Sequence, residues 1–198
     1  MNLYKNINLS TLFSIGIMLL LIFNYSLLMA QNNDTINQMK DGSRHGYWII
    51  NGDLANDKAY VPVAKVEEGL FNMGRRIGVW IKYYPEGSLK SKINYVNGKS
   101  QGAFTTYYKN GKVEENGNWE SKVYKGNFIR YYENGKIAQK KSFNDKGKTE
   151  GEVVYFYPNG QEELVFKTVN GMGRGNATRF WPNGDVKAEL SFNEKGES

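Results

Sequence analysis

Aromatic and basic residues that recur at a fixed spacing are the side chains of this sequence best suited to bind a ligand. The aromatic ones are Tyr84, Tyr108, Tyr132, Tyr157 and Trp181, and the basic ones that precede three of them by two residues are Lys82, Arg130 and Arg179. Residues two apart point to the same face of a β-strand, and a cation beside an aromatic ring suits a peptide, a glycan or a lipid headgroup. These residues are our candidate partner-binding residues. The alternative is a structural row, in which each cross-strand aromatic pair stabilises the sheet by roughly 0.2–1 kcal/mol.

Catalytic chemistry has few candidate residues in this chain, which contains one histidine, His45, and no cysteine. Nucleophilic catalysis needs a nucleophile beside a base, and a metal site needs several converging ligands. We therefore predict that the protein is not an enzyme and has no catalytic, cofactor-binding or metal-binding residues. His45 is expected to have a structural or solvent-facing role.

Three glycine clusters imitate nucleotide-binding loops. Gly98-Lys99-Ser100 and Gly147-Lys148-Thr149 resemble the end of a phosphate-binding loop, but Ile93 and Ser142 stand where the required upstream glycine should be. The glycines between residues 171 and 175 lack the spacing and the following helix of a dinucleotide loop. We predict that none of the three binds a nucleotide.

The elements that position the candidate residues are tandem copies of one five-residue sequence motif, which we call the word. The copies are YYPEG at 83–87, YYKNG at 107–111, YYENG at 131–135, FYPNG at 156–160 and FWPNG at 180–184, separated by 24, 24, 25 and 24 residues. A glycine stands five residues before each word, at Gly78, Gly102, Gly126, Gly151 and Gly175. A degenerate copy with Gly42, Gly46 and Trp48 comes first. Such a period indicates a repeat architecture.

Each copy reads as a β-hairpin. The segment before the word is rich in aromatic and β-branched residues, which favours a strand, and Asn-Gly ends four of the five words. Asn-Gly is typical of a type I′ turn with positive φ at both central residues. After the turn, apolar Leu89, Ile93 and Tyr95 alternate with polar residues, so one sheet face should be apolar and the other solvated.

These patterns predict an all-β fold, an elongated single-layer antiparallel sheet of tandem β-hairpins. About ten to twelve strands at about 4.8 Å each would extend the sheet to roughly 50 Å. We assign the degenerate copy to residues 42–67, with an insertion from Asn51 to Lys65, and the clear copies to 68–198. Residues 31–41 are expected to be a disordered lead.

The first thirty residues have the order of a secretory signal peptide. Lys5 precedes an apolar run from Leu12 to Leu28, and Ala30 is followed by a polar segment. We predict a signal peptide over residues 1–30 and export to the periplasm, the outer envelope or the medium. A single N-terminal membrane anchor is the alternative, because the run approaches the roughly 20 residues of a spanning helix.

The remaining charges are mixed rather than clustered. The chain has 26 basic and 20 acidic residues and a net charge of +6, and only Lys5 is ionisable before residue 31. A nucleic-acid-binding surface requires basic residues gathered on one face. We therefore expect a solvated surface with weak attraction to anionic groups, and no nucleic-acid partner.

The repeat resembles the MORN-repeat variant family of bacterial proteins, through its Gly-x-x-x-Gly-x-aromatic pattern, its paired aromatics and its x-Asn-Gly turn at a period near 24. The resemblance covers residues 68–198, and the degenerate copy extends it to 42. It implies stacked hairpins in one antiparallel sheet and a role in protein or lipid contact. Some members are labelled YwqK-type antitoxins.

The leading hypothesis is an exported, non-catalytic binding module that uses a sheet face or an edge strand. A protein is the expected partner, with an anionic lipid or a glycan of the cell envelope as alternatives. The second hypothesis is an antitoxin-like protein that neutralises a toxin by binding it. An envelope enzyme is the third.

Overall fold

The fold consists of one open antiparallel sheet in a computed structural model that describes residues 36–121, 123–193 and 195–197. The strands are β1 (Gln38–Lys40), β2 (Ser43–Asn51), β3 (Lys65–Asn72), β4 (Arg75–Tyr83), β5 (Leu89–Val96), β6 (Lys99–Tyr107), β7 (Val113–Glu120), β8 (Val123–Tyr124), β9 (Gly126–Tyr131), β10 (Ile137–Phe143), β11 (Gly151–Phe156), β12 (Glu162–Val169), β13 (Met172–Phe180) and β14 (Val186–Ser191). The predicted signal segment lies outside the described residues.

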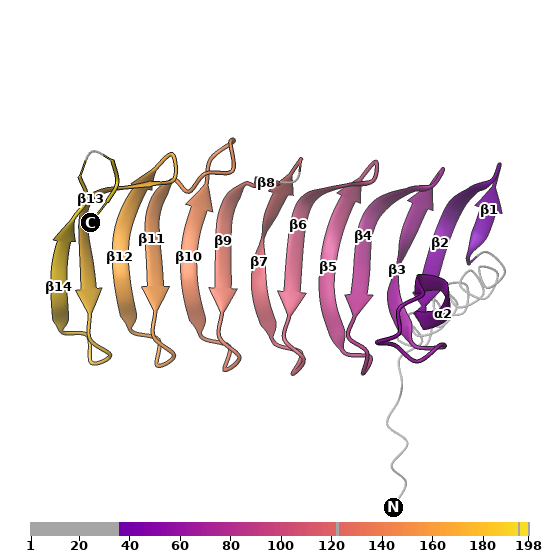
Figure 1. Ribbon diagram of the computed structural model, residues 1–198, viewed down its shortest axis with the longest axis horizontal. Helices are drawn as coiled ribbons and strands as arrows, with labels where there is room; N and C mark the ends of the chain where they lie inside the picture. The colour runs from indigo at the N-terminus through magenta and orange to yellow at the C-terminus, as the bar shows by residue number, and fades with distance from the viewer. Residues whose placement is uncertain (1–35, 122, 194, 198) are drawn as a thin grey trace, which may run out of the picture. The chain divides into compact units, whose positions relative to one another are not determined.

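Strand order in the sheet follows the order of the chain. In the described part of the chain, all 14 strands belong to one sheet, and β8 alone lies off the main path, where it pairs with the end of β7. Each hairpin therefore lies between the preceding and the following one (Figure 1). The predicted all-β sheet of tandem hairpins is confirmed.

The hairpin loops that contain the repeated word differ from the expected turn type. The Tyr108 N–H donates to the Lys112 carbonyl at 2.9 Å, and the Gly111 N–H donates to the Tyr108 carbonyl at 2.9 Å. Gly111 has a φ of 81°, whereas Asn110 has no positive φ. This is a three-residue loop with a type I turn followed by a left-handed glycine. The type I′ prediction is wrong here because three residues separate the paired strands, so only the last one needs positive φ.

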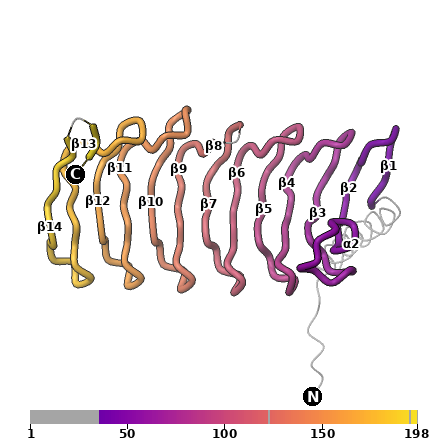
Figure 2. The backbone as a smooth tube through the Cα atoms, in the orientation of Figure 1, coloured from indigo at the N-terminus to yellow at the C-terminus, as the bar shows by residue number. Residues whose placement is uncertain are grey.

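The type I′ turns lie at the opposite ends of the strands, which Figure 2 shows as the second row of loops. Asn97 and Gly98 have φ values of 51° and 81°, and Asn170 and Gly171 have values of 51° and 85°. Between β10 and β11 the loop is instead closed by the Asn144 N–H, which donates to the Lys148 carbonyl at 2.9 Å. That loop has one residue more than a type I′ turn, which explains the single spacing of 25 residues.

The start of the array is more ordered than predicted. Strand β1 pairs with β2 where a disordered lead was expected, and the Trp48 indole N–H donates to the Gln38 carbonyl at 3.2 Å. Side-chain contacts thus hold residues 38–40 onto the sheet, while residues 31–35 lie outside the described residues. The predicted insertion begins with one helical turn, α2 (Gly52–Ala55), capped by the side chain of Asn51. Within the described part of the chain, no helix has the length and apolarity needed to span a membrane.

The core is a row of side chains across the middle of one sheet face, three residues before each word. Its members are Trp48, Trp80, Phe104, Phe128, Val153 and Ala177, all buried. Trp80 also lies flat on the neighbouring strand, where a Cβ on Gly69 would come within 2.6 Å of its ring. Glycine at that position therefore lets the ring lie against the backbone.

Candidate binding face

One face of the sheet carries the ring-to-ring contacts of the described residues, and we call it the aromatic face. It carries Trp48, Phe71, Trp80, Tyr95, Phe104, Trp119, Tyr124, Phe128, Phe143, Phe166 and Phe192. Many of these rings touch in pairs; the centroids of Trp119 and Tyr124, for example, are 4.2 Å apart in a stacked arrangement. The face is continuous from copy to copy because the strand register pairs equivalent positions, such as Trp80 with Ile93.

The tyrosines of the predicted aromatic row connect neighbouring copies. Each hydroxyl donates to the carbonyl of the first aromatic residue in the next word: Tyr84 to Tyr107 at 2.9 Å, Tyr108 to Tyr131 at 2.7 Å, Tyr132 to Phe156 at 2.5 Å and Tyr157 to Phe180 at 2.9 Å. Tyr60, in the insertion, makes the same bond to Tyr83 at 2.7 Å. We call this series the tyrosine ladder. These hydroxyl groups have a structural role.

Trp181 ends the predicted row differently. Its side chain is exposed, and the Lys187 ammonium lies 4.0 Å from the centre of its ring. A cation–π contact thus stands where the other copies have a hydroxyl bonded to the next hairpin.

A second ladder runs through the asparagines of the loops. The Asn134 amide N–H donates to the Pro158 carbonyl at 2.9 Å, and that of Asn159 donates to the Pro182 carbonyl at 2.7 Å. The same side chains accept from the backbone within their own loops, as Asn134 does from Lys136 at 2.9 Å. Sequence reasoning treated these asparagines only as turn formers, although their fixed place in the word was the available signal.

The three predicted cations have unequal surroundings. Arg130 is paired with Glu115, with an Nη2 to Oε1 distance of 2.6 Å. Among the described residues, the side chains of Lys82 and Arg179 make no hydrogen bond and no ion pair. The structure therefore places all three on the aromatic face, with Lys82 and Arg179 free to contact a ligand.

A depression in the aromatic face lies over β10 to β14, and we call it the C-terminal depression. Its volume is about 390 Å³, and its apolar lining includes Val153, Leu164, Phe166, Ala177, Leu190 and Phe192. The core row explains its position, since Trp48 and Trp80 are followed by Phe104 and Phe128 and then by Val153 and Ala177. The depression forms where rings give way to small side chains. Sequence reasoning missed this taper because periodic alternation treats all apolar residues alike.

The polar lining of the C-terminal depression is basic or neutral. It comprises Gln139, Lys141, Thr149, Thr168 and Arg179, and no aspartate or glutamate is among the described residues that line it. The Lys141 ammonium lies 4.8 Å from the centre of the Phe128 ring. Burial, and then the nearby charge of Arg130, lower the pKa of Lys141. The depression thus combines apolar walls with cations, which suits an apolar group that carries negative charge.

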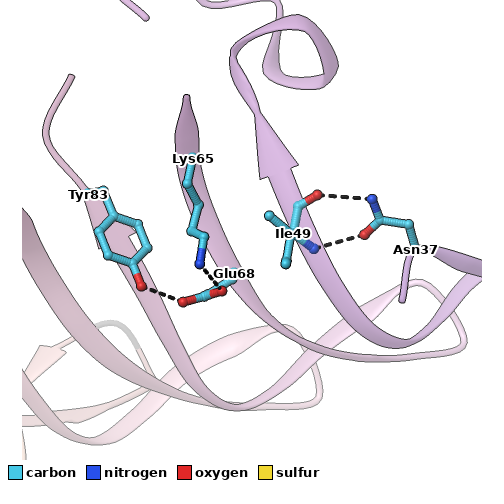
Figure 3. Close-up of polar contacts among 5 residues, drawn as sticks. All are labelled: Asn37, Ile49, Lys65, Glu68 and Tyr83. Atoms are coloured by element: carbon cyan, nitrogen blue, oxygen red, sulfur yellow. Dashed lines mark hydrogen bonds and ion pairs between the residues drawn. The ribbon is translucent and has the colours of Figure 1, made fainter. Parts of the chain in front are cut away.

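On the opposite face, the carboxylate of Glu68 is buried. The Lys65 ammonium donates to it at 2.8 Å, and the Tyr83 hydroxyl donates to its other oxygen (Figure 3). Burial raises the pKa of Glu68, but the hydrogen bonds from Lys65, Tyr83 and Tyr47 outweigh it, so the net pKa is lowered. Burial and the same carboxylate raise the pKa of Tyr47 to about 12. Because its donors come from Tyr47, Lys65 and Tyr83, the cluster links β2, β3 and β4.

An asparagine clamp fixes the first strand pair near that cluster. The Asn37 side chain accepts from the Ile49 N–H at 2.8 Å and donates to the Ile49 carbonyl at 3.1 Å (Figure 3). This pair of bonds imitates the backbone pairing of an additional strand residue. It contributes to the order of the segment before β1.

The other sequence motifs lie in structural positions. His45 is in β2, and its carbonyl accepts from the Trp48 indole at 3.2 Å. The three glycine clusters begin in loops that join antiparallel strands, and a strand stands where a nucleotide loop would be followed by a helix. No group of three or more histidine, cysteine, aspartate or glutamate side chains gathers in the described ranges of the chain.

Hairpins added one after another to an open sheet, each bonded to the next by tyrosine and asparagine side chains, define a β-repeat protein of the solenoid type. The MORN repeat variant family matches residues 76–97, 100–121, 124–145, 149–164 and 174–194. These segments cover just over half of the sequence, and the chain belongs to this family. Its repeats generally act as binding modules for proteins or membrane lipids and are typically non-enzymatic. No curated protein matches the sequence.

Proposed function

We propose that this protein is an exported, non-catalytic binding module that holds a protein partner on its aromatic face. The observation that carries the proposal is the C-terminal depression, because an apolar hollow of about 390 Å³ with convergent polar groups has the size of a ligand site. The membership in a family of binding repeats supports the same function.

Two unpaired cations on the aromatic face support the choice of that face. The side chains of Lys82 and Arg179 have no hydrogen-bond or ion-pair partner among the described residues. Arginine and aromatic residues, which this face combines, are enriched at protein interfaces.

Site-specific photocrosslinking in cells tests this proposal. Lys82 and Val79 are both exposed, lie on the same strand and face opposite sides of the sheet. A photoreactive residue at position 82 should give a discrete crosslinked protein, and the same residue at position 79 should not. Equal crosslinking from both positions, or none from position 82, would contradict the choice of face.

Export is a separate part of the proposal, supported by the charged start, apolar run and small residue of the first thirty residues. Cell fractionation and N-terminal sequencing of the full-length product test it. We expect a protein outside the cytoplasm whose chain begins at Gln31. A product that keeps Met1 and remains in the inner membrane would instead support the anchor.

A further inference from the structure

We propose that the C-terminal depression binds an apolar side chain flanked by carboxylates, within an extended acidic segment of the protein partner. This inference rests on the proposed function and names the chemistry that the partner must present. It concerns the last copies of the repeat, whereas the proposed function concerns the aromatic face as a whole.

The apolar part of the proposal follows from the core row. Trp80, Phe104 and Phe128 fill the position three residues before the word, whereas Val153 and Ala177 leave it open. Phe166 and Phe192 stand beside the opening, with their ring centres 5.6 Å apart. An apolar side chain inserted into this opening would therefore contact Phe166 and Phe192. In the earlier copies, the ring of the core row takes up the equivalent space. If the inserted side chain is aromatic, its contacts with these rings add to the stabilisation from burial.

The charge of the lining specifies carboxylates. Arg179 and Lys141 both line the depression, and none of its described lining residues is acidic. Arg130, the equivalent of Arg179 two copies earlier, is already paired with Glu115. Arg179 has no such partner among the residues that the structure describes. Its planar guanidinium can form two parallel hydrogen bonds with one carboxylate.

The size of the depression favours a peptide over a lipid. A volume of about 390 Å³ lies at the lower end of ligand pockets. It is suited to one large side chain with its flanking backbone, rather than to the paired acyl chains of a phospholipid. The threonines and the glutamine of the lining can also bond a peptide backbone.

Binding of defined peptides to the protein tests the proposal. The probe is a blocked peptide of sequence Gly-Glu-Phe-Glu-Gly, and its partner probe has glutamine in place of both glutamates. We expect the acidic peptide to bind about tenfold more tightly than the glutamine peptide. This factor is the affinity expected from about one charge-assisted hydrogen bond. Titration calorimetry measures both affinities at low and moderate salt concentration.

Two variants and one control assign the binding to the depression. Ala177→Phe restores the ring of the earlier copies and should abolish binding of both peptides, with an unchanged circular dichroism spectrum. Arg179→Gln changes an exposed side chain and should remove the preference for the acidic peptide. Lys167→Gln removes the same charge from the opposite face of the adjacent β12 and should have no effect.

Three results would overturn the proposal. The first is that the acidic peptide does not bind. The second is that Arg179→Gln and Lys167→Gln weaken peptide binding equally. The third is that the protein binds phosphatidylglycerol vesicles and not the peptide, and that Ala177→Phe abolishes this vesicle binding. Crosslinking from position 82 in the Ala177→Phe variant distinguishes a wrong peptide site from a wrong binding face. If a partner is still crosslinked there while no peptide binds the depression, the aromatic face remains the binding face and only the pocket is refuted.

Discussion

Removing one hydroxyl of the tyrosine ladder should destabilise the protein by an amount that can be estimated from the structure. The Tyr132 hydroxyl donates to the Phe156 carbonyl at 2.5 Å, in a partly buried site between two hairpins. A neutral hydrogen bond contributes about 0.5–1.5 kcal/mol, and a buried carbonyl left without a partner costs about 1–3 kcal/mol. For Tyr132→Phe we therefore expect a loss of about 1–2 kcal/mol in the free energy of unfolding.

Urea denaturation followed by circular dichroism measures this loss. The slope of the unfolding free energy against urea concentration reports whether the surface exposed on unfolding changes. Tyr155→Phe is the matched control, because Tyr155 lies in the adjacent copy and its hydroxyl has no hydrogen-bond partner among the described residues. The control should change the free energy of unfolding by less than about 0.5 kcal/mol. Equal effects of the two substitutions would refute the assignment of the hydroxyls to a ladder between copies.

Three further predictions concern the loops, the buried carboxylate and the repeat unit. Glu86 occupies the asparagine position of the first word and cannot donate to the next loop, so Glu86→Asn should stabilise the protein by about 0.5–1.5 kcal/mol in the same urea assay; no gain would argue against an asparagine ladder. The folded-state pKa of Glu68 lies below its ordinary value of 4.5, so its stabilisation is present above about pH 4.5 and is lost as pH falls through the folded pKa. The melting temperatures of wild type and Glu68→Gln should therefore converge below that pH, and a constant difference would contradict the lowered pKa. Deletion of residues 102–125, one complete copy, should leave a shorter β-sheet protein by circular dichroism, whereas loss of all folded signal would contradict a nearest-neighbour array.

The repeat allowed most of the fold to be predicted from the sequence. A word that recurs every 24 or 25 residues, with a glycine five positions earlier, places each hairpin at a known point in the chain. Successive hairpins then pair in chain order, as the strand order shows. Strand β1 was missed because its order depends on long-range contacts, such as the bond from Trp48 to Gln38.

The turn types show where local rules were insufficient. Asn-Gly was expected to form type I′ turns within the words, yet it does so at Asn97-Gly98 and Asn170-Gly171 and not at Asn110-Gly111. The dipeptide is the same in both places. The number of residues between the paired strands decides the turn, and that number depends on the register of the strands.

The candidate site was predicted only in part. Lys82, Arg130 and Arg179 lie on the aromatic face, and their role in partner binding stays a prediction, whereas the tyrosines of the row are hydrogen-bonded to neighbouring copies. Which cation is already paired depends on Glu115, a residue on another strand. The C-terminal depression depends on side-chain volume across several copies, at Val153 and Ala177 above all.

Side-chain footprinting with hydroxyl radicals compares the two faces of the sheet in one sample and therefore reports which face binds the partner. Tyr155 on the aromatic face and Tyr47 on the opposite face are equally exposed, each at 38%. When the protein is oxidised in a cell-envelope extract that contains its partner, we expect Tyr155 to be protected and Tyr47 to remain accessible. Protection of Tyr47 alone, or equal protection of both, would contradict a binding module that uses its aromatic face.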